Sequence, residues 1–203
     1  NATFEEVAYL MFHGELPNQA QLDGYRAVLK ANRELPQALL EVLERIPASA
    51  HPMDVLRTGC SMLGNLEPED GFENQQRAAD RLLGALPGII NYWYRFSHEG
   101  VRIETDTGAE SLAGHFLQTL TGEKPSELHE RIMDISLILY AEHEFNASTF
   151  TARVCASTLS DMHSCVTGAI GSLRGPLHGG ANEAAMELIE KFSSAEEATA
   201  GIL

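Results

Sequence analysis

Several features that mark whole classes of protein are missing from this sequence of 203 residues. No uncharged apolar run approaches the roughly 20 residues that span a bilayer, so we expect no membrane partner. Lysine and arginine together number 14 against 29 acidic residues, and the formal net charge is −15. Nucleic-acid binding needs basic side chains in excess to neutralise phosphates, so we expect no nucleic-acid partner.

Cysteine is scarce, and the common cofactor motifs are absent. The three cysteines, Cys60, Cys155 and Cys165, form no CxxC pair and lie in apolar helical segments. This pattern predicts reduced thiols in a cytoplasmic protein rather than a disulfide framework or a structural zinc site. No Walker A, GxGxxG or GxSxG pattern occurs, and the HExxH motif of zinc proteases fails at Ala147. A nucleotide-binding or serine-hydrolase fold therefore has no support.

The sequence does have a succession of amphipathic helical patterns. Thr3 and Glu6 form a capping-box pattern, and His51 before Pro52 marks another helix start, so we interpret His51 as a helix-start residue rather than a ligand. Only residues 101–103 alternate in a way that could give a short strand. With 44% hydrophobic residues, the chain has enough apolar side chains for a sizeable core. The sequence predicts an all-α, multi-helical fold.

Residues 174–184 combine a rigid turn with one histidine, His178. Pro176 fixes its own φ, and Gly175, Gly179 and Gly180 can adopt dihedral angles closed to other residues. An apolar face from 181 to 192 predicts a helix directly after the turn, which places His178 at a helix N-terminus. That position favours a neutral imidazole, which could donate a proton to a developing enolate or take one from carbon. A surface histidine in a glycine turn is the alternative.

A second histidine follows the amphipathic pattern of residues 126–140. His143 is expected at the C-terminal end of that helix, where the negative end of the helix dipole favours a protonated ring. A cationic His143 would suit a carboxylate ligand. The alternative is a helix-ending histidine that only pairs with Glu142 or Glu144.

Small residues recur on one side of the helix expected over 161–173. Ser164, Gly168 and Ser172 are spaced by four, beside an apolar stripe. Such a flat face lets another helix approach closely. We interpret it as a central packing helix or a dimer helix.

The two histidine segments, residues 141–149 and 175–184, together resemble the paired signature of the citrate synthase family. Phe145, residues 49–54 and 149–153, and the aromatic segment 91–94 are most similar to the bacterial 2-methylcitrate synthase branch of that family. The resemblance covers essentially the whole chain. It implies an almost wholly helical homodimer, condensation of oxaloacetate with an acyl-CoA thioester, and neither a metal nor a cofactor, since acyl-CoA is a substrate.

The resemblance also implies roles for individual residues. His178 matches the histidine that acts on the thioester carbonyl, His143 matches an oxaloacetate-binding histidine, and Asn146 is a neighbouring substrate-binding position. Arg95 has two interpretations, a residue that contacts a CoA phosphate or a solvated residue at a helix end. The family's catalytic aspartate, second catalytic histidine and most of its substrate arginines would follow Leu203, so this chain is expected to be inactive alone. Because the sequence begins at Asn1 rather than Met and stops at Leu203 inside a new helical pattern, the chain looks truncated at both ends.

These implications give a specific expectation. Residues 1–180 would form part of a large helical domain, and residues 181–203 would begin a small one. The expected activity is an acyltransferase reaction that condenses oxaloacetate with propionyl-CoA, and also acetyl-CoA, to 2-methylcitrate or citrate through an enol. The alternatives are a citrate synthase that uses acetyl-CoA, and a catalytically silent helical dimer with a packing or regulatory role.

Overall fold

The computed structural model describes residues 2–202 and confirms the all-α prediction. Over this range the chain forms α-helices joined by turns and one short 3₁₀ turn, with no strand. The helices are α1 (Phe4–His13), α2 (Gln19–Ala31), α3 (Gln37–Leu43), α4 (Pro52–Leu66), α5 (Gln75–Glu99), α6 (Leu112–Thr121), α7 (Glu127–Tyr140), α8 (Ala147–Ala156), α9 (Met162–Leu173), α10 (Gly180–Ile189) and α11 (Ala195–Ile202), with the 3₁₀ turn at Phe72–Asn74.

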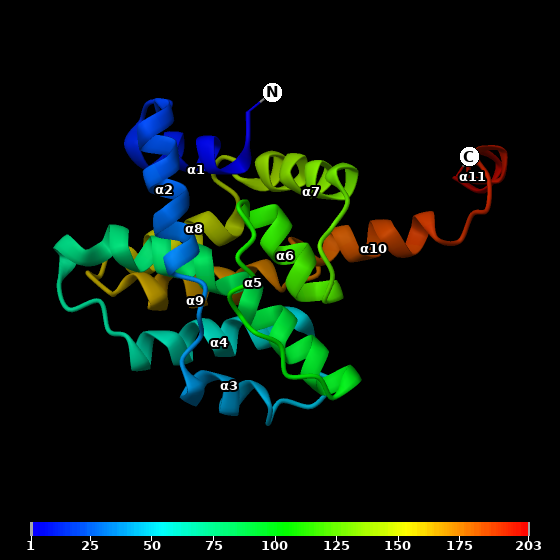
Figure 1. Cartoon of the computed structure of the whole chain (residues 1–203). Helices are drawn as coiled ribbons and strands as arrows, with labels where there is room; N and C mark the ends of the chain where they lie inside the picture. Colours follow the sequence, from blue (N-terminus) through cyan, green and yellow to red (C-terminus); the bar gives the residue numbers. More distant parts are fainter. Residues whose placement is uncertain (1, 203) are drawn as a thin grey trace.

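Helix α5 is the centre of the bundle (Figure 1). It packs against α2, α3, α4, α6 and α9, and it continues through Pro87 without a break. Its inner face carries Ile89 and Trp93, which are 0% and 1% exposed. Burial of such large apolar side chains contributes about 1.5–3 kcal/mol each. Ile89 and Trp93 are therefore part of the core.

Helix α9 packs against α8 on one side and α4 on the other. Gly168, on the small face predicted on α9, lies against α8: a Cβ added there would be 3.5 Å from Cγ2 of Thr151, an ordinary van der Waals distance. Helices α8 and α9 carry the two histidine segments at their ends. This packing brings the two segments together, whereas association with a second copy of the chain remains a prediction.

The last two helices, α10 and α11, lie outside the packed bundle. The side chains of residues 181–190 in α10 are exposed, and α10 and α11 extend away from the other helices (Figure 1). The proposed domain boundary near residue 180 remains a prediction. Residues 101–104 form neither a helix nor a strand in the described part of the chain, so the short strand expected there is wrong. No helix within residues 2–202 is both long and apolar enough to cross a bilayer.

Candidate active site

His178 lies in a tight turn between α9 and α10, and backbone hydrogen bonds close that turn. The N–H of Gly179 donates to the carbonyl oxygen of Leu173 over 2.9 Å, and the N–H of His178 donates to that of Gly175 over 3.0 Å. His178 directly precedes Gly179, the N-cap of α10. The imidazole is therefore presented beside a helix start.

The glycines of this turn provide space rather than an unusual backbone conformation. None of Gly175, Gly179 and Gly180 has a positive φ, and Gly179 is nearly helical, with φ −62° and ψ −31°. The expectation of dihedral angles closed to other residues is therefore wrong. A Cβ on Gly179 would lie only 2.3 Å from the carbonyl oxygen of Leu173. Glycine is needed there because the backbone passes so closely over the end of α9.

Ser148, from the other histidine segment, contacts the half-buried ring of His178. The Nε2 atom of His178 lies 2.9 Å from Ser148 Oγ and accepts the backbone N–H of Ser148 over 3.3 Å. A backbone N–H can only donate, so this bond requires an Nε2 without a proton and places the ring hydrogen of neutral His178 on Nδ1. Among residues 2–202, Nδ1 makes no hydrogen bond, which leaves it available as a donor to a substrate.

Asn146 joins the two histidine segments as the N-cap of α8. Its Oδ1 atom accepts the N–H of Thr149 over 2.9 Å and lies 2.7 Å from Oγ of Ser148, so the single hydroxyl hydrogen of Ser148 is shared between Asn146 and His178. Its Nδ2 atom donates to the carbonyl oxygen of His143 over 3.4 Å. Asn146 thus holds the His143 loop against the residue that contacts His178. The structure gives Asn146 a capping role, and its contact with substrate stays a prediction.

His143 is exposed in the loop between α7 and α8. Helix α7 ends at Tyr140, so the expectation that His143 sits in its last turn is wrong. The positive φ of Glu144, 56°, and the hydrogen bond from its N–H to the Glu142 carboxylate turn the chain away from the helix. Within residues 2–202, His143 forms no ion pair with either glutamate. Its imidazole is therefore accessible, 5.8 Å between ring centroids from Tyr140.

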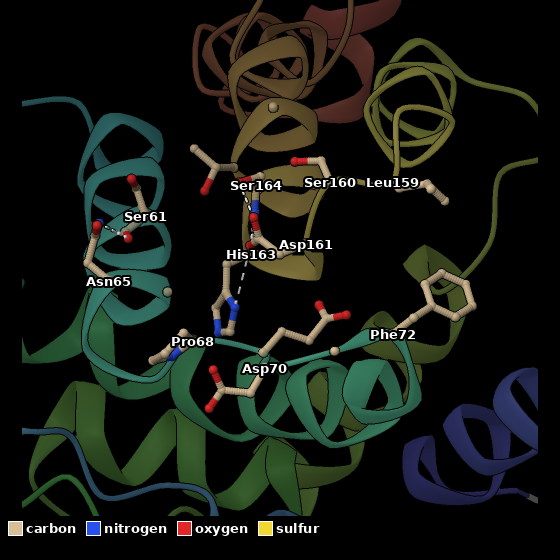
Figure 2. A pocket seen from close by; sticks show the side chains of 15 residues that line it. Ser61, Asn65, Pro68, Asp70, Phe72, Leu159, Ser160, Asp161, His163 and Ser164 are labelled. Carbon is tan, nitrogen blue, oxygen red and sulfur yellow. Dashed lines mark hydrogen bonds and ion pairs between the residues drawn. The ribbon is translucent and has the colours of Figure 1, made fainter.

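A cavity of about 1000 Å³ lies elsewhere, between α4, the loop after it and the start of α9 (Figure 2). His163 projects into it and is 3% exposed, and burial lowers the pKa of this histidine. Its Nδ1 atom lies 3.8 Å from Oδ1 of Asp161. The cavity contains no residue of either histidine segment. The candidate site is therefore defined by the His143, Asn146, Ser148 and His178 cluster and not by the size of an opening.

Arg95 is held by the protein at the end of α5. Its Nη1 atom donates to the carbonyl oxygen of Leu120 over 3.3 Å, and its Nε atom lies 3.1 Å from Oε2 of Glu99. The side chain is 16% exposed, so it is not the solvated helix end that one interpretation expects. A contact with CoA phosphate remains a prediction.

Sequence reasoning missed Ser148 as the partner of His178, although a signal for such a contact exists. The first N–H groups of a helix have no partner within the helix, and an asparagine N-cap satisfies only some of them. Ser148 is the second residue after the Asn146 cap, so its N–H is free to bind a ligand or a side chain. That this partner is His178 depends on how α8 and α9 pack.

The family model for the C-terminal domain of citrate synthase matches residues 1–203. The chain is 72% identical over 198 residues to a 2-methylcitrate synthase from Shewanella oneidensis, covering 98% of this chain and 53% of that protein. The chain thus spans about half the length of the curated relatives that it matches.

Solved structures agree with this family match. A citrate synthase from Thermotoga maritima superposes with a TM-score of 0.82 at 36% identity, over 97% of this chain and 52% of that one. Citrate synthase from Thermoplasma acidophilum, in a ternary complex with carboxymethyl coenzyme A and oxaloacetate, superposes with a TM-score of 0.87 at 28% identity. That match covers 95% of this chain and 51% of the other.

Proposed function

The chain belongs to the citrate synthase family, and on this premise we propose that the enzyme condenses oxaloacetate with propionyl-CoA, and also with acetyl-CoA. The products would be 2-methylcitrate or citrate, together with free CoA. The observation that carries the proposal is the ring of His178, which Ser148 holds with Nδ1 available as a hydrogen-bond donor. The high identity to a 2-methylcitrate synthase supports the choice of propionyl-CoA.

His178 would donate from Nδ1 to the carbonyl oxygen of the thioester. The α-proton of a thioester is too weakly acidic for an unaided carboxylate, so charge must be stabilised on the oxygen as the proton leaves. A preorganised donor of this kind contributes about 2.7–4 kcal/mol to the transition state. Ser148 would fix the tautomer and the ring orientation. The base that removes the proton is not assigned to a residue of this chain.

His143 would bind the dicarboxylate. Its ring is exposed, and its backbone carbonyl oxygen accepts a hydrogen bond from the Asn146 side chain, which also contacts Ser148. Oxaloacetate held there would lie near the thioester on which His178 acts. A protonated imidazole can form a charge-assisted hydrogen bond with a carboxylate. Asn146 could add a contact through its amide only by giving up part of its capping role.

The choice between the two acyl-CoA substrates is the finer part of the proposal. The similarity to solved citrate synthases favours acetyl-CoA as the alternative substrate. One methylene is worth about 1–3 kcal/mol of discrimination in an apolar pocket. The test is a comparison of kcat/KM for thioester release from the two acyl-CoAs by the full-length enzyme. A higher value for acetyl-CoA would contradict the assignment to propionyl-CoA.

We extend the proposal to a cytoplasmic homodimer that uses no metal and no cofactor beyond its acyl-CoA substrate. The dimer rests on the resemblance to the citrate synthase family, and sedimentation of the full-length enzyme tests it. A catalytically silent helical dimer is the alternative of a different class. Thioester release that depends on oxaloacetate would exclude it, and the absence of such release would favour it.

A further inference from the structure

The segment 51–54 has no place in the chemistry proposed above, yet it contacts both sides of the turn that carries His178. Its residues form the N-cap and first turn of α4. On one side, Nε2 of His51 lies 2.8 Å from Oε1 of Glu183 in α10. On the other side, Oδ2 of Asp54 lies 3.6 Å from Nε of Arg174, the C-cap of α9. The turn thus has one anchor before His178 and one after it.

The His51 ring is oriented by its own helix. Its Nδ1 atom accepts the backbone N–H of Met53 over 3.1 Å, so Nδ1 carries no proton in this arrangement. The ring hydrogen therefore lies on Nε2, and His51 donates it to the carboxylate of Glu183. The same ring thus caps α4 through Nδ1 and donates to Glu183 through Nε2. The orientation of the hydrogen bond to Glu183 is consequently fixed by the helix cap, whereas most surface ion pairs have no such restraint.

This contact matters because, within the described part of the chain, α10 has few other restraints. The side chains of residues 181–190 are exposed, and α10 extends away from the bundle (Figure 1). Among residues 2–202, the pair of His51 and Glu183 is the one side-chain hydrogen bond or ion pair that joins α10 to another element. Glu183 follows His178 by five residues. Movement of α10 would therefore turn the backbone that carries the imidazole.

We propose that His51 and Glu183 are positioning residues, which hold the turn of His178 in the orientation that aims Nδ1 at the thioester oxygen. This inference rests on the proposed condensation reaction. His51 and Glu183 touch no reacting atom in it. They act by fixing the start of α10 to the start of α4. A misplacement of the catalytic group by about 1 Å can cost a hundredfold in rate, so a restraint of this kind has a measurable effect.

The test uses the full-length enzyme and variants that separate positioning from helix capping. His51→Asn keeps a good N-cap on α4 but shortens the side chain, so it no longer reaches Glu183. Glu183→Ala removes the acceptor, and Glu183→Gln keeps an acceptor oxygen at the same place. Glu187→Ala, at an exposed position one turn further along α10, is the matched control.

We expect His51→Asn and Glu183→Ala each to lower kcat and the exchange of acyl-CoA α-protons by about tenfold. The KM for oxaloacetate should stay within about threefold, since His143 is untouched. The double variant should be no worse than either single variant, because both remove one contact. Glu183→Gln should keep at least about half of the wild-type kcat, since it can still accept the hydrogen bond, and Glu187→Ala should match the wild type.

Several results would overturn the inference. The inference fails if His51→Asn and Glu183→Ala keep kcat within twofold of wild type, or if their losses multiply in the double variant. It also fails if Glu183→Gln is as slow as Glu183→Ala, or if the loss of activity only follows a loss of folded protein. The outcome is separable from the proposed function. If His178→Ala is inactive while these variants are normal, only the positioning role fails, whereas a wild-type enzyme without condensation activity refutes the function itself.

Discussion

The Nε2 atom of His178 lies 2.9 Å from the Oγ atom of Ser148, a residue thirty positions earlier in the chain. Helices α8 and α9, which pack side by side, bring the two residues together. The Ser148 backbone N–H adds a second bond to the same ring nitrogen. The pair therefore determines which ring nitrogen of His178 keeps the hydrogen.

Ser148→Ala should lower kcat moderately and leave oxaloacetate binding intact. The variant loses the hydroxyl that lies within hydrogen-bond distance of both His178 and Asn146, but it keeps the backbone N–H that defines the tautomer. One such hydrogen bond is worth about 1 kcal/mol, or about fivefold in rate. Steady-state kinetics of the full-length enzyme would measure the change. Ser136→Ala, which removes a hydroxyl that bonds within exposed α7, is the control, and equal rates for the two variants would refute the role of Ser148.

Gly179→Ala should disturb the turn of His178. The added Cβ would meet the Leu173 carbonyl oxygen at 2.3 Å, so either the turn or the end of α9 must move. We expect a loss of about 1–3 kcal/mol in the free energy of unfolding, with a fall in kcat. Gly24→Ala in α2 is the control, because its Cβ would meet nothing within 4 Å and should be neutral or stabilising. Denaturant unfolding that shows the same stability for both variants would contradict the steric account.

The helix starts could be predicted from the sequence because their determinants are local. Thr3 and Glu6 form the expected capping box at α1, and His51 accepts the N–H of Met53 at the start of α4. A cap involves residues two or three positions apart, and the apolar period repeats within a few turns. These local patterns can be recognised in the sequence without knowledge of the rest of the fold.

Other features escaped prediction because distant contacts or rare conformations decide them. The loop between α7 and α8 includes Glu144 with a positive φ, which non-glycine residues rarely adopt and which the sequence does not reveal. The need for Gly179 comes from the approach of the Leu173 carbonyl oxygen. The partner of His178 is a serine on another helix. The sequence thus identifies the reactive histidine but not the residues that orient it.

His115 should make stability depend on pH below neutrality. It is 0% exposed, and burial lowers its pKa to about 4 from the ordinary histidine value of 6.5. Between those values the unfolded chain binds more protons than the folded one, so the stability present above pH 6.5 is lost as the pH falls toward 4. The loss from this group is about 3 kcal/mol at most.

Denaturant unfolding at several pH values, with His115→Asn for comparison, would measure this dependence. The asparagine keeps an acceptor toward Thr107, whose hydroxyl oxygen lies 3.0 Å from Nδ1 of His115. The variant should be less stable at pH 7 because it leaves a cavity. Its stability should fall less steeply than that of the wild type between pH 6.5 and 4. Parallel curves for the two proteins would mean that His115 does not remain neutral in the fold.

The central claim, that His178 acts on the thioester while His143 holds the dicarboxylate, is tested most directly by comparing His178→Ala with His143→Ala in the full-length enzyme. Calorimetry would measure oxaloacetate affinity, and deuterium exchange at the α-carbon of the acyl-CoA would measure enolisation. His178→Ala should keep oxaloacetate affinity within about threefold while turnover and exchange fall about a hundredfold or more. His143→Ala should instead weaken oxaloacetate binding. Loss of oxaloacetate binding with intact exchange in His178→Ala would contradict the account.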